Sequence, residues 1–148
     1  MRHMAKLALL ATVVLRVALL AEAQAVKTFK ARLSPVPIDV AMQATVSGTG
    51  LVTATLTGTR LVVNGTFAGL KSPATIVQIH KGQRGVRGPA ILDLKATNGT
   101  SGTISGEIDL SPQQVENLQK SWLYVQLHSE KAPDGNLWGW LLPQEARK

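Results

Sequence analysis

Cysteine is absent from this sequence, and aromatic residues make up only 4% of it. Without cysteine there are no disulfides, no zinc–thiolate sites and no cysteine nucleophile. Hydrophobic residues still account for 45% of the 148 residues, and threonine, valine and glycine are abundant. This composition suits many short strands rather than a helix bundle, in a chain long enough for one domain with a sizeable core.

Residues 1–25 are typical of a secretory signal peptide. Arg2 and Lys6 give a positively charged start, an apolar segment spans residues 7–20, and overlapping A-x-A cleavage sequences follow it. An uncleaved membrane anchor is the alternative, but the segment is short for a span and Arg16 in its middle is costly. We therefore predict cleavage, a secreted or periplasmic protein, and no membrane span in the mature chain.

Acidic residues are fewer than basic ones, nine against 16, which gives a formal net charge of +7. Removing residues 1–25 takes three basic residues and Glu22 away and leaves +5. The remaining excess is modest and spread along residues 26–148, which we predict to form one domain. A solvated surface explains this excess better than a nucleic-acid interface does, particularly in an exported protein.

Alternation of apolar and polar residues predicts seven to nine short strands. The expected strands are residues 28–33, 41–46, 51–56, 60–67, 74–80, 91–97, 103–110, 123–128 and 136–142. Ser111, Pro112 and Gln114 predict the start of one connecting helix that ends near Lys120. There is no βαβ alternation, so the pattern favours an all-β sandwich or a Greek-key barrel.

Glycine-containing segments mark the expected turns. Residues 57–59 and 133–135 should each turn a hairpin, and Asn64-Gly65 should form a bulge within its strand. Asn64 and Asn98 each begin an Asn-Gly-Thr sequence, which has the form of an N-glycosylation acceptor. Asn-Gly is favoured at turns for conformational reasons alone, and a sugar would depend on the host, so the turn interpretation comes first.

A series of short motifs in a fixed order covers residues 28–142. They are residues 67–75, 79–80, 88–94, 102–106, 110–111, 114–115, 123–125, 128 and 133–139. This order resembles the CHRD domain, a module first described in chordin and common in secreted bacterial proteins. The resemblance implies an immunoglobulin-like, superoxide-dismutase-like Greek-key sandwich without an established activity. Many members read His-Ile-His where this chain has Gln78-Ile79-His80, which weakens a metal role for that doublet.

His80 and His128 each end an apolar strand, so they could meet at one rim if those strands are neighbours. Two imidazoles and a carboxylate such as Asp134 or Glu130 would suit Cu(II) or Zn(II). The alternative is that each ring N–H bonds a backbone carbonyl and fixes a turn. Two ligands without an evident third favour that alternative, so we expect no cofactor. A histidine-rich copper–zinc centre is excluded, because the mature chain has only these two histidines.

Residues 81–88 carry three cations among three glycines. Lys81, Arg84 and Arg87 are candidates for contact with an anion, with backbone N–H groups cradling a phosphate or sulfate. The segment lacks a Walker sequence, and its glycines can simply permit tight turns. An exposed basic loop is therefore the simpler interpretation.

Trp138 and Trp140 share one face of the last strand. They could form a stacking platform for sugars or a partner. Apolar residues occupy both faces of this segment, which favours burial, and we expect at least one of the two in the core.

Nothing in the sequence predicts an enzyme. Ser111 and Ser129 lack a Gly-x-Ser-x-Gly setting, and Asp93 and Asp109 are single carboxylates on separate strands. We predict a non-catalytic binding or structural module of the cell envelope, with an unknown protein or polysaccharide as its partner. The alternative is a small metal-binding or redox-related protein that uses the two histidines.

Overall fold

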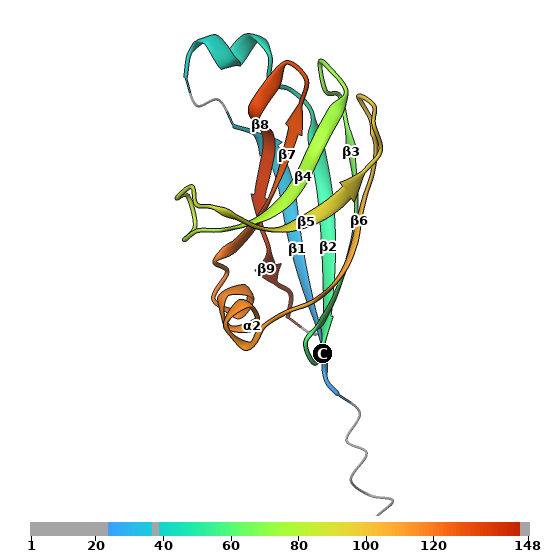
Figure 1. Cartoon of the computed structure of the whole chain (residues 1–148), viewed down its shortest axis with the longest axis vertical. Helices are drawn as coiled ribbons and strands as arrows, with labels where there is room; N and C mark the ends of the chain where they lie inside the picture. Colours follow the sequence, from blue (N-terminus) through green and yellow to red (C-terminus); the bar gives the residue numbers. More distant parts are fainter. Residues whose placement is uncertain (1–23, 37–38, 146–148) are drawn as a thin grey trace, which may run out of the picture.

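The chain folds as an antiparallel β-barrel (Figure 1). The computed structural model describes residues 24–36 and 39–145, so the predicted signal peptide lies outside the described residues except for its last two positions. The strands are β1 (Val26–Pro35), β2 (Thr49–Thr57), β3 (Arg60–Ala68), β4 (Ala74–Lys81), β5 (Ala90–Ala96), β6 (Gly102–Asp109), β7 (Leu123–Ser129), β8 (Ala132–Trp140) and β9 (Leu142–Pro143). The helices are the 3-10 helix η1 (Ala41–Ala44) and the α-helix α2 (Pro112–Gln119).

Eight strands close the barrel in the order β1-β2-β3-β6-β5-β4-β7-β8, with β8 again beside β1. β1 pairs with β2 along residues 26–33 and then with β8 at Ser34 and Pro35. β5 pairs with β4 and then, at Lys95 and Ala96, with β6. The predicted all-β fold with one short α-helix is confirmed for the described residues. The predicted sandwich is replaced by a closed barrel, because β1 and β5 join its two sides.

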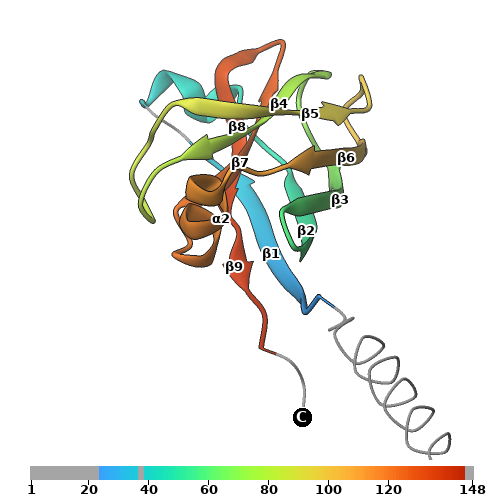
Figure 2. The ribbon, with the colours of Figure 1, turned by 60° about the horizontal axis from the view of Figure 1, so that its bottom comes forward.

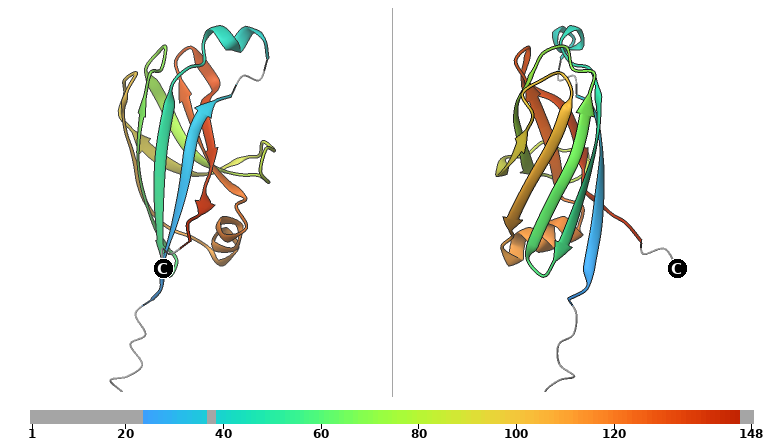
Figure 3. Two further views of the ribbon diagram at one scale, coloured as in Figure 1. Left: turned by 180° about the vertical axis from the view of Figure 1, so that it is seen from behind. Right: turned by 90° about the vertical axis from the view of Figure 1, so that its right-hand side faces the viewer.

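The strand connections place β3 beside β6, although β4 and β5 lie between them in the sequence. This is a Greek-key arrangement. Figures 2 and 3 show a flattened barrel with β1, β2, β3 and β6 on one side and β4, β7 and β8 on the other. α2 joins β6 to β7 across one end of the barrel (Figure 1).

The barrel core follows from alternation along the strands. On β7, Leu123, Val125 and Leu127 are fully buried in the core. Tyr124 and Gln126 therefore face away from the barrel interior. This outward face of the β4-β7-β8 side carries the candidate site.

Two predictions of local structure between residues 41 and 66 are wrong. Residues 41–46 do not form a strand; η1 begins there, and the Asp39 carboxylate accepts a hydrogen bond from Met42 N at 2.9 Å. Asn64-Gly65 is not a bulge, because Gly65 pairs regularly with β2 and with β6. A Cβ at position 65 would lie 2.7 Å from the Leu51 main-chain oxygen, so glycine permits the close approach of β2.

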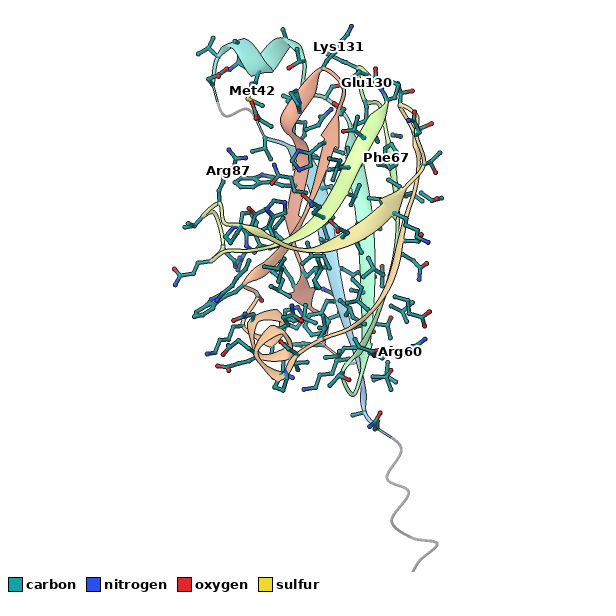
Figure 4. All side chains as sticks on the ribbon, in the orientation of Figure 1. Met42, Arg60, Phe67, Arg87, Glu130 and Lys131 are labelled. Carbon is teal, nitrogen blue, oxygen red and sulfur yellow. The ribbon has the colours of Figure 1, made fainter. Side chains whose placement is uncertain are left out.

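The predicted turn at residues 133–135 is also wrong. The β7–β8 hairpin turns at Glu130 and Lys131, which lie at its tip (Figure 4). Residues 133–135 instead form a bulge in β8, where the register shifts. Gly135 has a φ of +128°, and a Cβ there would collide with the Gln126 amide. The bulge therefore requires glycine at this position.

The helix begins as predicted. Ser111 Oγ accepts a hydrogen bond from Gln114 N at 3.2 Å, and Ser111 N donates to Gln114 Oε1 at 2.9 Å, which completes a capping box. Leu118 is fully buried, and Val115 packs against the core, as expected. In the described ranges, no helix has the length and apolar character needed to cross a membrane.

Replacing Ser111 by alanine removes the cap, and we expect the free energy of unfolding to fall by about 1 kcal/mol. Urea denaturation followed by tryptophan fluorescence measures this change. Ser101→Ala, at an exposed position between β5 and β6, is the control and should have little effect. Equal effects of the two substitutions would contradict the role of the cap.

Candidate functional site

Six side chains form a second cluster on the outward face of β4, β7 and β8. These residues, which we call the outer cluster, are His80, Tyr124, Gln126, His128, Trp138 and Trp140. The strand register brings them together, because His80 pairs with Tyr124, Tyr124 with Trp140, and Gln126 with Trp138. Residues directly opposite one another on neighbouring strands share a face of the sheet. The cluster is therefore a consequence of the strand order β4-β7-β8.

Tyr124 is the centre of the outer cluster and is fully buried. Its ring centre lies 5.0 Å from that of His80, 4.8 Å from Trp140 and 5.8 Å from Trp138. The two tryptophans are half-buried, and their ring centres are 4.8 Å apart with a 65° angle between the planes. Neither belongs to the barrel core, contrary to our prediction. Their steep mutual angle also gives no flat stacking surface.

The connection between β4 and β5 folds over the outer cluster. We call residues 81–89 the basic loop, on which Arg87 is labelled in Figure 4. Trp140 Nε1 donates to Gly82 O at 3.0 Å. The Tyr124 hydroxyl accepts from Gly88 N at 2.9 Å and donates to Gly88 O at 3.1 Å. The outer cluster thus holds the loop near both of its ends.

The composition of the basic loop has a steric explanation. A Cβ on Gly82 or Gly88 would collide with main-chain oxygens of the loop itself. The amides of these two glycines donate to acceptors within the protein, so they are not turned towards a bound anion. Lys81, Arg84 and Arg87 are exposed, and none of them forms an ion pair with another described residue. An anion at this loop would therefore be bound by the charged side chains and not by the amides of Gly82 and Gly88.

His80 and His128 meet, as expected for neighbouring strands. Their ring centres are 6.2 Å apart, with 29° between the ring planes. Each ring is also anchored through Nδ1, His80 to Gly88 O at 2.9 Å and His128 to Pro133 O at 2.8 Å. A carbonyl oxygen only accepts hydrogen bonds, so each ring carries a proton on Nδ1. The two histidines therefore fix the basic loop and the β8 bulge in place.

The bulge supplies main-chain oxygens to this cluster. Asp134 is exposed, and its main-chain oxygen accepts from Gln126 Nε2 at 3.1 Å and from Arg87 Nη2 at 3.0 Å. Glu130 lies in the hairpin turn. Within residues 24–36 and 39–145, no three His, Asp or Glu side chains gather closely enough to hold a metal ion. The structure thus brings the two histidines together without a carboxylate.

Tyr124 and Gln126 are the two members of the outer cluster that were not predicted from the sequence. Gln126 is only 1% exposed, and its Oε1 has no hydrogen-bond partner among the described residues. The same is true of His80 Nε2 and His128 Nε2, which are also buried. The signal was present in the sequence, because Gln126 alternates with Tyr124 and His128 in an otherwise apolar strand.

Burial lowers the pKa of His80 below its usual value of 6.5. The neighbouring His128 and the Arg87 guanidinium lower this pKa further, while the hydrogen bond to Gly88 O acts in the opposite direction. His80 is therefore neutral at pH 7.

The side chains considered for catalysis have structural roles. Ser111 caps α2, and Ser129 Oγ accepts a hydrogen bond from Asn136 Nδ2 at 2.8 Å. The Asp93 carboxylate accepts from Gln78 Nε2 at 2.8 Å. These contacts hold the helix, the hairpin and the sheet.

The fold and the site define a single-domain antiparallel β-barrel whose polar and aromatic side chains gather outside the core under a basic loop. The chain matches the sequence profile of the CHRD domain over residues 18–141, nearly its whole length, and it belongs to this family. No match to a curated protein or to a solved structure was found. The CHRD domain is not a known enzyme family, which favours a non-catalytic module.

Acid should destabilise the protein through His80. Its pKa is lowered in the folded state, so the unfolded chain takes up the proton first as the pH falls below 6.5. The free energy of unfolding then decreases by at most about 1.4 kcal/mol per pH unit until folded His80 also protonates. Urea denaturation in EDTA, over a range of about pH 5 to 8, measures this dependence.

The control is His80→Asn, which keeps a donor near the Nδ1 position but does not titrate. Its free energy of unfolding should depend less on pH below 6.5 than that of the wild type. The same pH dependence in both proteins would show that His80 is not responsible.

Replacing Tyr124 by phenylalanine removes the hydroxyl that hydrogen-bonds both the main-chain N–H and the main-chain oxygen of Gly88. We expect the protein to lose about 1 to 3 kcal/mol of stability, because the Gly88 amide loses its partner. Hydrogen exchange at Gly88 should accelerate more than exchange in β7. Unchanged protection at Gly88 would mean that Tyr124 does not hold the loop.

Proposed function

We propose that this domain is an exported, non-catalytic binding module of the cell envelope that recognises an anionic ligand through the basic loop. The observation that carries the proposal is a loop with three exposed cations that is held near both ends by hydrogen bonds from the outer cluster. An acidic polysaccharide is the ligand class that this charge and an envelope location favour. Export is supported by the signal-like residues 1–25 and by membership of the CHRD family.

Fixing the loop matters because ordering a flexible segment on binding costs free energy. Here Gly88 is bound by both His80 and Tyr124, and Gly82 by Trp140. A loop that is already ordered keeps more of its interaction energy when it binds. Arg84 and Arg87 add planar guanidinium groups, which recognise carboxylates and sulfates with two parallel hydrogen bonds.

The basic loop, residues 81–89, contains no acidic residue, which also supports its role in anion binding. None of its cations is neutralised by an ion pair within the described chain. By contrast, Arg60 and Lys120 are paired with Glu107 and Glu116. Cations without a partner retain more of their attraction for an external anion.

A sugar-stacking function is less well supported. Trp140 is half-buried and uses its indole N–H to hold Gly82 O, and Trp138 meets it at a steep angle. These contacts make Trp140 a support for the basic loop, and Trp138 packs against Trp140 and Tyr124. Stacking on a sugar requires an exposed ring face.

The test is binding of alginate to the K81Q/R84Q/R87Q variant. We expect affinity at least tenfold below that of the wild type, and weaker binding of both proteins as salt screens the charges. Isothermal titration calorimetry at two salt concentrations measures this, with neutral dextran as the ligand control.

The matched protein control is K27Q/K30Q/R32Q, which removes the same charge from exposed positions on β1. It should bind alginate nearly as well as the wild type. If both triple variants lose affinity equally, net charge rather than the basic loop drives binding. If the wild-type protein does not bind alginate at low salt, an acidic polysaccharide is the wrong ligand class.

A further inference from the structure

Three buried acceptor atoms in the outer cluster have no hydrogen-bond donor among the described residues. They are His80 Nε2, His128 Nε2 and Gln126 Oε1. His80 is 8% exposed and Gln126 only 1%. Burial of a polar atom without a partner is unfavourable, and such an atom in a folded protein calls for an explanation.

The protein itself determines that these three atoms are acceptors. Each histidine donates through Nδ1 to a main-chain oxygen, so Nε2 of the neutral ring presents a lone pair. Gln126 donates its amide N–H to Asp134 O, which assigns Oε1 as the remaining acceptor. In their neutral forms the two rings cannot satisfy one another, because both then lack a proton on Nε2. The cluster therefore calls for an external cation or donor.

We propose that His80 Nε2 and His128 Nε2, with Gln126 Oε1 as a third donor, bind one Zn(II) or Cu(II) ion. Neutral imidazole nitrogen suits both ions, and an amide oxygen serves as a weak ligand in some copper sites. This inference does not depend on what the basic loop binds.

The ring spacing is compatible with a shared ion. Metal–nitrogen bonds of about 2.1 Å, with about 1.2 Å from nitrogen to ring centre, put two coordinating imidazole centres at most about 6.6 Å apart. The observed separation is 6.2 Å. This spacing corresponds to an N–metal–N angle of about 140°, which is wider than the tetrahedral angle usual for Zn(II) and closer to a tetragonal Cu(II) site.

The surroundings of the two rings are also those of metal ligands. A ligating histidine almost always donates its other N–H to a carbonyl, carboxylate or water, which fixes its tautomer and orientation. Gly88 O and Pro133 O have this role here. The proposed ligand set contains no carboxylate or thiolate, and the Arg87 guanidinium lies close to it, donating to the same Asp134 main-chain oxygen as Gln126. We therefore expect micromolar affinity, well below that of a structural zinc site.

This ligand set differs from the one that the sequence suggests. There, the third ligand is a carboxylate from Asp134 or Glu130. In the structure the Asp134 side chain is exposed, and only its main-chain oxygen contacts the outer cluster, by accepting a hydrogen bond from Gln126 Nε2. Gln126 is buried on the same face of β7 as His128. Gln126 therefore takes the place of the carboxylate.

The experiment is equilibrium dialysis of the untagged full chain against zinc, and separately against copper, with the bound metal measured by mass spectrometry. A His3→Gln background leaves His80 and His128 as the two imidazoles. We expect one ion per folded chain. His80→Asn and His128→Asn should each reduce the affinity at least tenfold, because asparagine can replace the Nδ1 donor but not Nε2.

Gln78→Ala is the matched control, since Gln78 lies on the same face of β4 but is already paired with Asp93. It should leave metal affinity unchanged. His128→Asn is the more informative variant if His80→Asn does not fold, because His128 is less buried. Circular dichroism establishes that each variant is folded.

A second measurement uses the parent protein alone. Long-range ¹H–¹⁵N spectra of the histidine rings should show Nε2 unprotonated in both rings, and zinc should shift both Nε2 resonances. If zinc and copper at about 100 μM leave the folded parent unloaded and these resonances unchanged, the proposal is wrong. Equal loading of the parent and of both folded asparagine variants would also overturn it.

Discussion

The burial of β7 on both faces is the constraint on which the rest of the structure depends. Leu123, Val125 and Leu127 fill the barrel core on one face, while Tyr124 and Gln126 are just as deeply buried on the other. The second face has no strand layer to cover it, so the basic loop and the β8 bulge do so. Their main-chain polar groups then need partners, which the side chains of the outer cluster supply.

This arrangement explains why polar and aromatic residues lie together outside the core. Aromatic rings provide apolar surface beneath the loop, and their polar atoms hydrogen-bond its backbone. Tyr124 binds both polar groups of Gly88, and Trp140 binds Gly82 O. The same side chains thus stabilise the fold and hold the three cations of the loop in position.

Much of the fold could be predicted from the sequence, because short-range patterns determine it. The period-two alternation of β7 and the Ser111 capping box are local signals that nothing overrides. The sequence pattern leaves a sandwich and a Greek-key barrel open, because closure depends on β1 and β5 changing partners midway along their length. Residues 133–135 carry the chemistry of a turn, yet the pairing of Ser129 with Ala132 turns the chain earlier and leaves them as a bulge.

The candidate site could be predicted only in part. Alternation along the strands predicts that His80 and His128 point away from the barrel core. Their rings lie close together because β4 and β7 are neighbours. The exposure of Asp134 and the isolation of Gln126 Oε1 depend on how the bulge and the loop cover the sheet. Such contacts join residues that no local pattern links.

Closure of the barrel limits how any partner can bind. Each of its eight strands pairs with a neighbour on both sides, although β1–β8 and β5–β6 pair at only two positions each, so no strand has an edge that is unpaired along its whole length. The short β9 lies outside this ring and ends in Pro143, which has no backbone N–H to donate. Side chains on faces and loops therefore offer a partner more surface than the strand edges do. The same closure limits edge-to-edge association of the domain with other sheets.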